Sequence, residues 1–318
     1  MLGTQSFKAL KGVVAVNKPR GVVSKDVSRI VQKGLHDIKI GHVGTLDPMA
    51  EGVLVLVIGT ASRLQDYLVK LEKEYVFDLE LGRETDSLDS EGELIKEMPI
   101  PSVSSAKVQS VINSMLGCWE QTPPIYSAIK YKGKPLYSYA RSGRAHMVPL
   151  ADLKKIVEIR ELELTSVGAG RLTFRLSCSQ GTYVRAVGKA IADALGTCGT
   201  VTRIVRTRAA GVSVSDCHSL SYLEKNLSNF SNLIRPIGDL PIRLPRWKAV
   251  DSISAERLLM GQRLSLDAAA YHGGVSYAEG VDQLGEVLLL NDSGTVFGLG
   301  LSSSDSSGRI LLAMRRSL

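Results

Sequence analysis

The sequence predicts an α+β protein that carries a smaller β-rich unit toward its C-terminus. Strand-like alternation and helical periodicity are mixed in residues 1–240 without a regular strand–helix–strand repeat. The segment LPIRLPRWK, residues 240–248, contains two prolines and reads as a linker, and the apolar runs after it are short. We therefore expect a first domain over residues 1–240 and a second over residues 245–318.

The first expected elements surround a glycine-rich loop. Residues 12–17 (GVVAVN) read as a short apolar strand. Ser24 is placed to cap a helix that continues to about Gly34. The glycine-rich loop, residues 41–52, comes next. The run 53–58 (VLVLVI) is short and β-branched, which favours a strand over a helix.

The middle of the chain continues the mixture of strands and helices. Residues 74–81 place aromatic and aliphatic side chains on one face and acids on the other, as a half-buried strand does. Residues 108–116 have helical spacing, and residues 172–178 form a second alternating strand. A helix is expected from 182 to 195, and Gly196 is placed to end it.

The tail is expected to contain a short helix near residues 255–260 and strands at 286–290 and 310–313. Its charges balance, since eight Lys or Arg face eight Asp or Glu from residue 241 onward. The formal net charge of +7 therefore lies entirely in residues 1–240.

Two basic windows carry most of this charge. Residues 126–147 hold five Lys or Arg and no acid, interleaved with four of the ten tyrosines, and residues 171–211 hold seven Lys or Arg against one acid. Cations bind phosphates and aromatic faces stack on unpaired bases, so these windows suit flexible or single-stranded RNA. The alternative is a solvated basic face with tyrosines packed at its rim. An exposed loop is expected to carry the nearby acids Glu84, Asp86, Asp89, Glu91, Glu93 and Glu97.

Composition and missing motifs argue against several classes of protein. The longest aliphatic run, residues 53–58, is far shorter than the ~20 residues of a membrane span. The first twelve residues have no apolar signal core, so we expect a cytoplasmic protein with no membrane partner. The four cysteines form no CxxC pair and the five histidines no HxxxH pair, which predicts no disulfide framework and no metal site. Phosphate-loop and dinucleotide motifs are also absent, so we expect no cofactor.

The loop GHVGTLDPMAEG contains the first candidate for chemistry. Its glycines permit close approach of a ligand. Asp47 precedes Pro48, which biases it toward a fixed, extended presentation, and His42 lies five residues before it. The alternative is a tight loop in which Asp47 makes only an Asx turn.

Two further residues are candidates to act with Asp47. Arg185 falls in the first turn of its expected helix, where a guanidinium and the helix N-terminus together form a cationic spot. This spot can hold Asp47 ionised or bind a phosphate. Tyr75 opens a strand on its apolar face. The alternatives are a solvent-paired arginine and an ordinary core tyrosine.

Five segments, in this order, closely resemble those of the bacterial TruB-type tRNA pseudouridine synthases. They are VNKPRGVVS, KIGHVGTLDPMAEGVLVLVIGTAS, KEYVFDLELGRETDSLDSEGEL, QTPPIYSAIKYKGKPLYSYAR and CSQGTYVRAVGKAIADALG. The resemblance covers nearly the whole chain and implies the pseudouridine-synthase fold, with a central mixed, largely antiparallel sheet flanked by helices. From about Leu244 the tail resembles, more weakly, the small PUA-like domain of the family.

The resemblance implies isomerisation of the uridine at position 55 in the T loop of tRNA to pseudouridine. It further implies an enzyme that needs no metal, no organic cofactor and no guide RNA, and we expect a monomer. Base flipping is required because the reacting atoms are inaccessible inside a stacked loop. Two other functions stay open: an RNA-binding factor that folds tRNA, with catalysis secondary, and a related synthase that acts on ribosomal or messenger RNA.

By resemblance, five positions receive roles in the reaction. Asp47 matches the nucleophilic aspartate, and attack at C1′ or at C6 stays open. Tyr75 matches the tyrosine that stacks on the target base and is implicated in removing the C5 proton. Arg185 matches the arginine that pairs with the aspartate. His42 matches the histidine that helps extrude or replace the flipped nucleotide, and Ile204 stands where relatives carry a leucine against the base.

Other positions are expected to support the site. Lys18 and Pro19 match a motif that supports the active-site loop, and Lys130 and Lys132 lie in the region that resembles an RNA-contact segment. Arg63 stands where relatives commonly have lysine, and the two side chains differ in hydrogen-bonding geometry.

Overall fold

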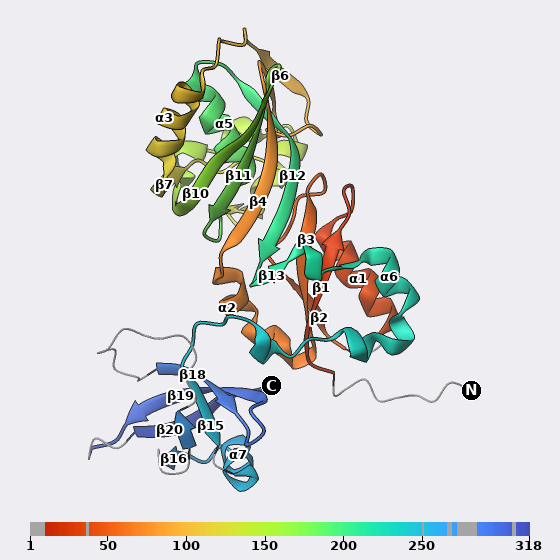
Figure 1. The fold of residues 1–318 in the computed structure, drawn as a ribbon, viewed down its shortest axis with the longest axis vertical. Coiled ribbons are helices and arrows are strands. Elements are labelled where there is room, and N and C mark those ends of the chain that lie inside the picture. The colour runs from red at the N-terminus through yellow and green to blue at the C-terminus, as the bar shows by residue number, and fades with distance from the viewer. Residues whose placement is uncertain (1–9, 36–37, 250, 266–268, 272–284, 307–309) are drawn as a thin grey trace.

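The computed structural model describes residues 10–35, 38–249, 251–265, 269–271, 285–306 and 310–318 (Figure 1). It is an α+β structure with a ten-stranded sheet and a six-stranded sheet, which confirms the predicted fold class. Residues 1–9, on which the secretion prediction partly rests, and the histidines at 36 and 272 lie outside the described residues.

The ten-stranded sheet has the order β14-β1-β3-β12-β4-β11-β10-β7, with β2 paired to β3 and β13 paired to β12. Its strands are β1 (Gly12–Lys18), β2 (Ile40–Val43), β3 (Glu51–Ile58), β4 (Lys73–Leu81), β7 (Gly117–Gln121), β10 (Lys155–Gly168), β11 (Arg171–Cys178), β12 (Gly199–Ala209), β13 (Val212–Ser213) and β14 (His218–Ser219). Neighbouring strands are antiparallel except for β1–β14 and β3–β12, so the sheet is mixed and largely antiparallel.

Helices and short hairpins flank this sheet. The α-helices are α1 (Ser24–Gly34), α2 (Gln65–Lys70), α3 (Ser105–Met115), α4 (Leu136–Arg141), α5 (Val184–Leu195) and α6 (Leu220–Lys225). The hairpins are β5 (Arg83–Thr85) with β6 (Leu94–Glu97), and β8 (Lys130–Tyr131) with β9 (Lys134–Pro135). No helix in the described part of the chain is long and apolar enough to cross a membrane.

The strand β4 behaves as its sequence predicts. Buried and half-buried residues alternate along it without a break, and the buried face packs beneath α3 and α5. Phe77 stacks on Phe174, its partner on β11, with 5.3 Å between ring centroids. Such cross-strand aromatic pairs stabilise a sheet beyond the burial of their area.

The strand β3 is buried on both faces, which explains its unbroken apolar sequence. It pairs with β1 on one side and with β12 on the other, so it lies inside the sheet. Val53, Val55 and Val57 belong to one apolar cluster, while alternate residues such as Leu54 and Leu56 belong to another. Two covered faces leave no position where a polar residue would meet water.

The starts of α1 and α5 differ from expectation. Ser24 is the first residue of α1, but Val23 occupies the capping position and no side chain caps the helix. The Ser24 hydroxyl instead bonds to the backbone of Leu46. Helix α5 begins at Val184 rather than at residue 182. Its predicted end is confirmed, because Gly196 adopts the left-handed conformation that ends many helices.

The prediction of an exposed acidic loop over residues 84–97 is wrong for two of its members. Glu84 is 7% exposed and Asp89 is 5% exposed. The connection between β5 and β6 lies near β12, and two cations of α5 pair with these acids. Lys189 binds Glu84 and Arg185 binds Asp89. Long-range pairing of this kind leaves no local signal in the sequence.

The six-stranded sheet has the order β16-β20-β19-β18-β15-β17. Its elements are β15 (Arg246–Ala249), α7 (Ser252–Leu259), β16 (Leu264–Ser265), β17 (Ala269–Tyr271), β18 (Gly285–Leu290), β19 (Val296–Ser304) and β20 (Ile310–Ser317). Helix α7 and strands β18 and β20 overlap the ranges predicted for them.

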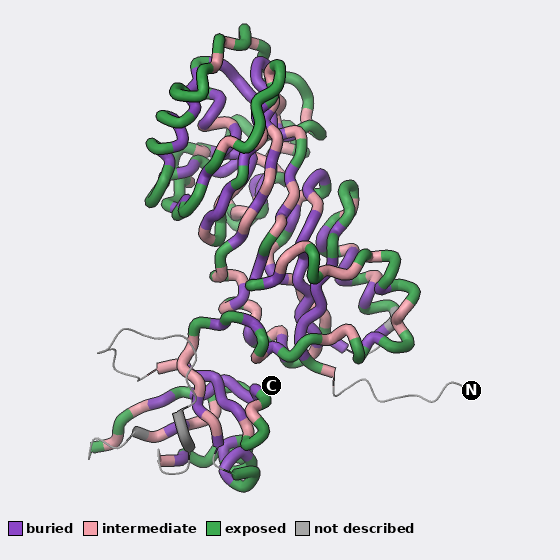
Figure 2. The backbone as a smooth tube through the Cα atoms, viewed as in Figure 1, coloured by how far each residue is buried: buried purple, intermediate pink, exposed green. Residues whose placement is uncertain are grey.

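The two sheets share buried side chains. Val287 and Leu289 of β18 pack into the core of the smaller sheet, while Leu288 and Leu290 join the cluster that contains Val55 of the larger sheet. Figure 2 shows buried segments running through the strands of both sheets. This alternation explains why β18, like β3, reads as a continuous apolar run.

Residue 63 lies at this junction. Its guanidinium bonds to the backbone and side-chain oxygens of Ser317 on β20, and its own carbonyl accepts from Arg316. Tyr67 bonds to Glu286 nearby. Arg63 therefore connects the segment after β3 with β20 of the smaller sheet.

Candidate functional site

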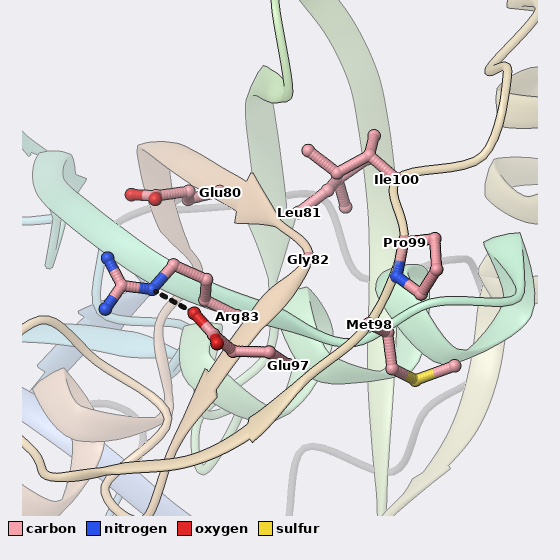
Figure 3. Close-up of a pocket in the computed structure, with 8 residues that line it drawn as sticks. All are labelled: Glu80, Leu81, Gly82, Arg83, Glu97, Met98, Pro99 and Ile100. Atoms are coloured by element: carbon pink, nitrogen blue, oxygen red, sulfur yellow. Dashed lines mark ion pairs between the residues drawn. The ribbon is translucent and has the colours of Figure 1, made fainter.

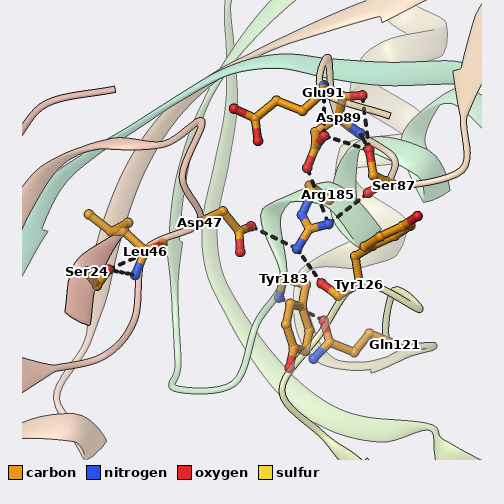
Figure 4. Close-up of polar contacts among 10 residues, drawn as sticks. All are labelled: Ser24, Leu46, Asp47, Ser87, Asp89, Glu91, Gln121, Tyr126, Tyr183 and Arg185. Atoms are coloured by element: carbon orange, nitrogen blue, oxygen red, sulfur yellow. Dashed lines mark hydrogen bonds and ion pairs between the residues drawn. The ribbon is translucent and has the colours of Figure 1, made fainter. Parts of the chain in front are cut away.

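Asp47 lies in the loop between β2 and β3 and faces Arg185 at the start of α5 (Figure 4). The Asp47 Oδ2 atom is 2.9 Å from Nη2 of Arg185. The arginine side chain is 3% exposed, while the aspartate side chain is 37% exposed. The structure therefore presents one side of the carboxylate outward and holds the other side against a buried cation.

The residues on both sides of Asp47 are held by earlier parts of the chain. The Ser24 hydroxyl donates to the carbonyl of Leu46 and accepts from its N–H, both at 2.9 Å. The Lys18 ammonium donates to the carbonyl of Pro48 at 3.3 Å. The N–H of Gly21 donates to the same carbonyl at 2.8 Å. These bonds fix the backbone immediately before and after the aspartate.

Lys18 connects Pro19 to this loop, since its ammonium bonds to the carbonyls of both Pro19 and Pro48. The Lys18 side chain is fully buried, and its ammonium also donates to the carbonyls of Pro19 at 3.0 Å and Val22 at 2.7 Å. Burial lowers the pKa of this ammonium to about 8, although the nearby Asp47 carboxylate opposes the shift. Three carbonyl acceptors compensate for the water that the ammonium has lost.

Arg185 is not the solvent-paired arginine of the alternative reading. One terminal nitrogen donates to the carbonyl of Ser87 at 2.8 Å and lies 3.4 Å from Asp89. The other donates to the carbonyl of Tyr126 at 2.9 Å and pairs with Asp47. The guanidinium thus bridges two carboxylates and two backbone segments in a fixed fork.

The surroundings of Asp47 raise the pKa of its carboxyl group. Burial is the largest cause, and the negative charge of Asp89 adds to it. The charge of Arg185 and its hydrogen bond act in the opposite direction. The sequence anticipated this opposing effect of Arg185 but not the dominant cost of removing the carboxylate from water.

An apolar wall stands beside Asp47. Tyr75 on β4 is 6% exposed and Ile204 on β12 is 3% exposed, and both belong to the buried cluster that includes Leu46. Burial raises the pKa of the Tyr75 hydroxyl, while a hydrogen bond and charge from Arg206 lower it. Tyr75 and Ile204 therefore lie on paired strands and belong to the same buried cluster as Leu46 of the Asp47 loop.

His42 lies on β2 at the edge of the loop. Its ring contacts the Ser28 hydroxyl at 3.2 Å and the Thr45 hydroxyl at 3.4 Å. Burial lowers the pKa of the imidazole, and the charge of Arg206 adds to this effect. The structure shows no bond between His42 and Asp47, so the histidine belongs to the rim and not to the charged pair.

Lys130 and Lys132 are exposed on the β8–β9 hairpin, apart from the charged pair. The ammonium of Lys132 lies 5.3 Å from the centroid of the Tyr131 ring. The basic window that contains them, residues 126–147, nevertheless contacts the site through its first residue, Tyr126. The carbonyl of Tyr126 accepts from Arg185, and its hydroxyl donates to Asp86 at 2.9 Å.

The sequence reading missed four residues of this site. Asp89, Ser24 and Arg206 have no local signal, because each acts on a segment distant along the chain. Tyr183 lies immediately before α5, and its N–H donates to the Gln121 side chain at 3.0 Å. Its place two residues before Arg185, in a basic window, was a signal that could have indicated it.

Among the described residues, no group of three or more His, Cys, Asp or Glu is placed to hold a metal ion. A surface hollow lies at the other end of β4 (Figure 3). It is lined by residues 80–83 and 97–100, and none of the candidate residues belongs to it. The chemistry of the site therefore depends on the Asp47 loop and not on this hollow.

Comparison with solved structures defines the fold class first. The chain is similar to a protein in the structure of an H/ACA RNP bound to a substrate RNA containing 2′-deoxyuridine, with a TM-score of 0.69 and 21% identity. It is equally similar to a chain of a Cbf5-Nop10-Gar1 complex, with a TM-score of 0.69 and 22% identity. Each match covers 96% of this chain and 84% of the other.

Sequence comparison then identifies the family. Residues 32–184 match the family model described as TruB family pseudouridylate synthase, N-terminal domain. A tRNA pseudouridine synthase B of Hydrogenovibrio crunogenus is 33% identical over 266 residues, which cover 84% of this chain and 85% of the relative. One from Opitutus terrae is 37% identical over 221 residues, covering 69% and 90%. The chain belongs to the TruB family of pseudouridine synthases, which are isomerases.

Proposed function

We propose that this enzyme converts the uridine at position 55 in the T loop of tRNA to pseudouridine, with Asp47 as its nucleophile. The observation that carries the proposal is the outward-facing carboxylate of Asp47 paired with the buried Arg185. The relatives named tRNA pseudouridine synthase B support tRNA as the substrate.

The reaction breaks the bond from C1′ to N1 of the uracil and forms a bond from C1′ to C5. The base must turn between these steps, C5 loses a proton and N1 gains one. A single carboxylate can add covalently at C1′ or at C6, or assist departure of the base. Arg185 holds Asp47 oriented and favours its charged form, which each of these routes requires.

The apolar wall is suited to a flipped base. We assign stacking on the base to the aromatic ring of Tyr75, and Ile204 belongs to the same buried cluster. Removal of the C5 proton is assigned to the Tyr75 oxygen, which accepts it after the hydroxyl has released its own proton. Burial raises the pKa of that hydroxyl, and the charge of Arg206 lowers it against this effect. We assign to His42, at the rim, the position that the flipped uridine leaves in the RNA.

We further propose that residues 1–240 form the catalytic domain and residues 245–318 a PUA-like domain. Lys130 and Lys132 are exposed cations, of which Lys132 lies over the Tyr131 ring, and both are assigned to RNA phosphates. We propose that the enzyme works in the cytoplasm as a monomer, without a guide RNA.

Tritium release from T-arm RNA labelled at C5 of the target uridine tests this function. Asp47→Asn keeps the shape of the side chain but removes its charge, so release is expected to fall to background. Asp152→Asn, on an exposed residue, is the matched control and is expected to behave as the parent. Release by Asp47→Asn at the parental rate would contradict the assignment of the nucleophile.

The basic window around Lys130 favours a second role in folding tRNA, independent of catalysis. Asp47→Asn separates the two roles, since it leaves the window intact. Rescue of tRNA folding without pseudouridine formation would show a distinct binding function. Mapping of modified uridines in cells that lack the enzyme decides the substrate, and a fully modified T loop in such cells would exclude tRNA in favour of another RNA.

A further inference from the structure

Arg206 is a buried arginine for which the proposed mechanism has no role. It lies on β12, two residues after Ile204, and its side chain is among the largest that are fully buried. None of the ion pairs found in the described part of the chain includes it. A buried cation with no counter-ion is costly unless hydrogen bonds replace its water.

The guanidinium of Arg206 binds both ends of the Asp47 loop. Its Nε atom donates to the carbonyl of Val53 at 2.7 Å, just after the loop. Its Nη2 atom donates to the carbonyl of Gly44 at 2.9 Å, just before the aspartate. One planar group thus sets the distance between the two places where the loop leaves the sheet.

The backbone of Arg206 holds the same loop from the strand. Arg206 pairs with Gly52 in the parallel register of β12 and β3. A Cβ atom on Gly52 would lie 2.3 Å from the Arg206 carbonyl oxygen, and Gly52 has a φ of +104°. Only glycine permits this approach, so the backbone of β12 at residue 206 restrains the end of the loop.

The same side chain also reaches Tyr75. The two residues are partners in the antiparallel register of β12 and β4, and the guanidinium lies close enough to the Tyr75 hydroxyl to lower its pKa by charge and hydrogen bonding. Arg206 therefore connects the segment that carries Asp47 with the aromatic residue assigned to the base. Arg185, in contrast, contacts the Asp47 carboxylate directly.

We propose that Arg206 is a positioning residue that fixes the Asp47 loop and the Tyr75 hydroxyl in one geometry for the reaction. The inference rests on the proposed function, because it concerns the relative placement of the two groups that act on the uridine. A positioning error of about 1 Å at a reacting centre can cost about 100-fold in rate. Arg206 acts through Asp47 and Tyr75 and touches no substrate atom.

Single-turnover tritium release with Arg206→Lys tests the proposal. Lysine keeps the charge but cannot bind Val53, Gly44 and Tyr75 with one planar group. The single-turnover rate is expected to fall about 100-fold. The dissociation constant for T-arm RNA is expected to stay within about twofold, because the surface that binds RNA is unchanged. Arg257→Lys, on an exposed residue of α7 outside both basic windows, is the matched control and is expected to keep both values.

Arg206→Gln is the second variant, because a neutral side chain at this buried position removes the cost of the unpaired charge. It is expected to fold and to show the same loss of rate. A parental rate in either folded variant overturns the proposal, and so does failure of both to fold, which would leave Arg206 a purely structural role. If the parent itself releases no label, the proposed function fails, whatever Arg206 does.

Discussion

The cation of Arg185 is shared between Asp47 and Asp89, so the Asp47 carboxyl is exposed to opposing electrostatic effects. Burial and the charge of Asp89 raise the pKa of Asp47, while Arg185 lowers it. A nucleophilic carboxylate must be ionised, so the rate is expected to rise with pH as this group loses its proton. Removal of the Arg185 charge should therefore shift this rise to higher pH, and removal of the Asp89 charge should shift it to lower pH.

Replacement of Arg185 by methionine removes the effect that lowers the pKa of Asp47. The carboxyl then stays protonated to higher pH. The acid limb of the pH–rate profile is therefore expected to shift to higher pH, and the maximal rate is expected to fall. Arg185→Lys keeps the charge and should leave the limb closer to its parental position. The profile is measured by single-turnover tritium release, and an unmoved limb in Arg185→Met would contradict this account.

Replacement of Asp89 by asparagine is expected to shift the acid limb in the opposite direction from Arg185→Met. It removes a negative charge that raises the pKa of Asp47, so the acid limb is expected to move to lower pH. Asp193→Asn is the control, because Asp193 is an exposed partner of Lys189 and does not contact Arg185. A shift of the limb to higher pH in Asp89→Asn would show that loss of the Arg185 geometry outweighs the charge effect.

The individual residues of the site were predictable only in part. Asp47 before Pro48 and Arg185 at a helix start carry local signals, and the ordered motifs assigned their roles. Asp89 carries none, and its sequence surroundings indicated an exposed loop. Its burial depends on Arg185, a residue far along the chain, and a contact between distant segments has no periodicity to read.

At the scale of elements, alternation predicted strands better than capping rules predicted helix starts. The pattern of β4 follows from one buried face, which any alternating sequence reports. Ser24 had the correct type for a cap, yet its hydroxyl serves the Asp47 loop instead. A serine hydroxyl can bond either to the start of its own helix or to the backbone of another segment, and tertiary packing decides which partner it binds.

The junction of the Asp47 loop with β3 predicts a sharp difference between two glycines. Gly52 and Gly196 both have positive φ, but a Cβ atom on Gly52 would meet the Arg206 backbone, whereas nothing lies within 4 Å of one on Gly196. Gly196→Ala is expected to cost about 1–2 kcal/mol of stability from backbone strain alone. Gly52→Ala should cost much more and abolish tritium release, because the loop must move.

Urea denaturation and the release assay measure this pair of variants. The comparison is matched because both substitutions add one methyl group at a left-handed position. Equal stability of the two variants would mean that β3 and β12 separate easily, and the close approach of Gly52 to Arg206 would then not restrain the loop.

At the scale of the whole molecule, charge and hydrophobicity gave different kinds of information. Charge counting placed the entire net charge before residue 241, and this agrees with a site in the larger sheet. The proline-rich segment lies, along the chain, between the strands of the two sheets. The sequence did not reveal that the two sheets share a buried cluster. The apolar run of β18 shows that both faces of this strand are buried, but not which core each face joins.

This shared cluster predicts that the two sheets unfold together, although we propose them as separate domains. Leu289 is buried only within the core of the smaller sheet, beside Trp247, while its neighbour Leu288 packs into the shared cluster. A large apolar interface couples units that would otherwise melt independently. Leu289→Ala, which should cost about 2–5 kcal/mol, is therefore expected to destabilise the larger sheet as well.

The two tryptophans of the chain make this measurable, since Trp119 lies on β7 of the larger sheet and Trp247 on β15 of the smaller one. Fluorescence in single-tryptophan variants reports each sheet during urea denaturation. Leu289→Ala should lower both midpoints together, whereas Leu301→Ala, at an exposed position of β19, should leave both nearly unchanged. A parental midpoint at Trp119 with a lowered midpoint at Trp247 would show that the shared cluster does not couple the sheets.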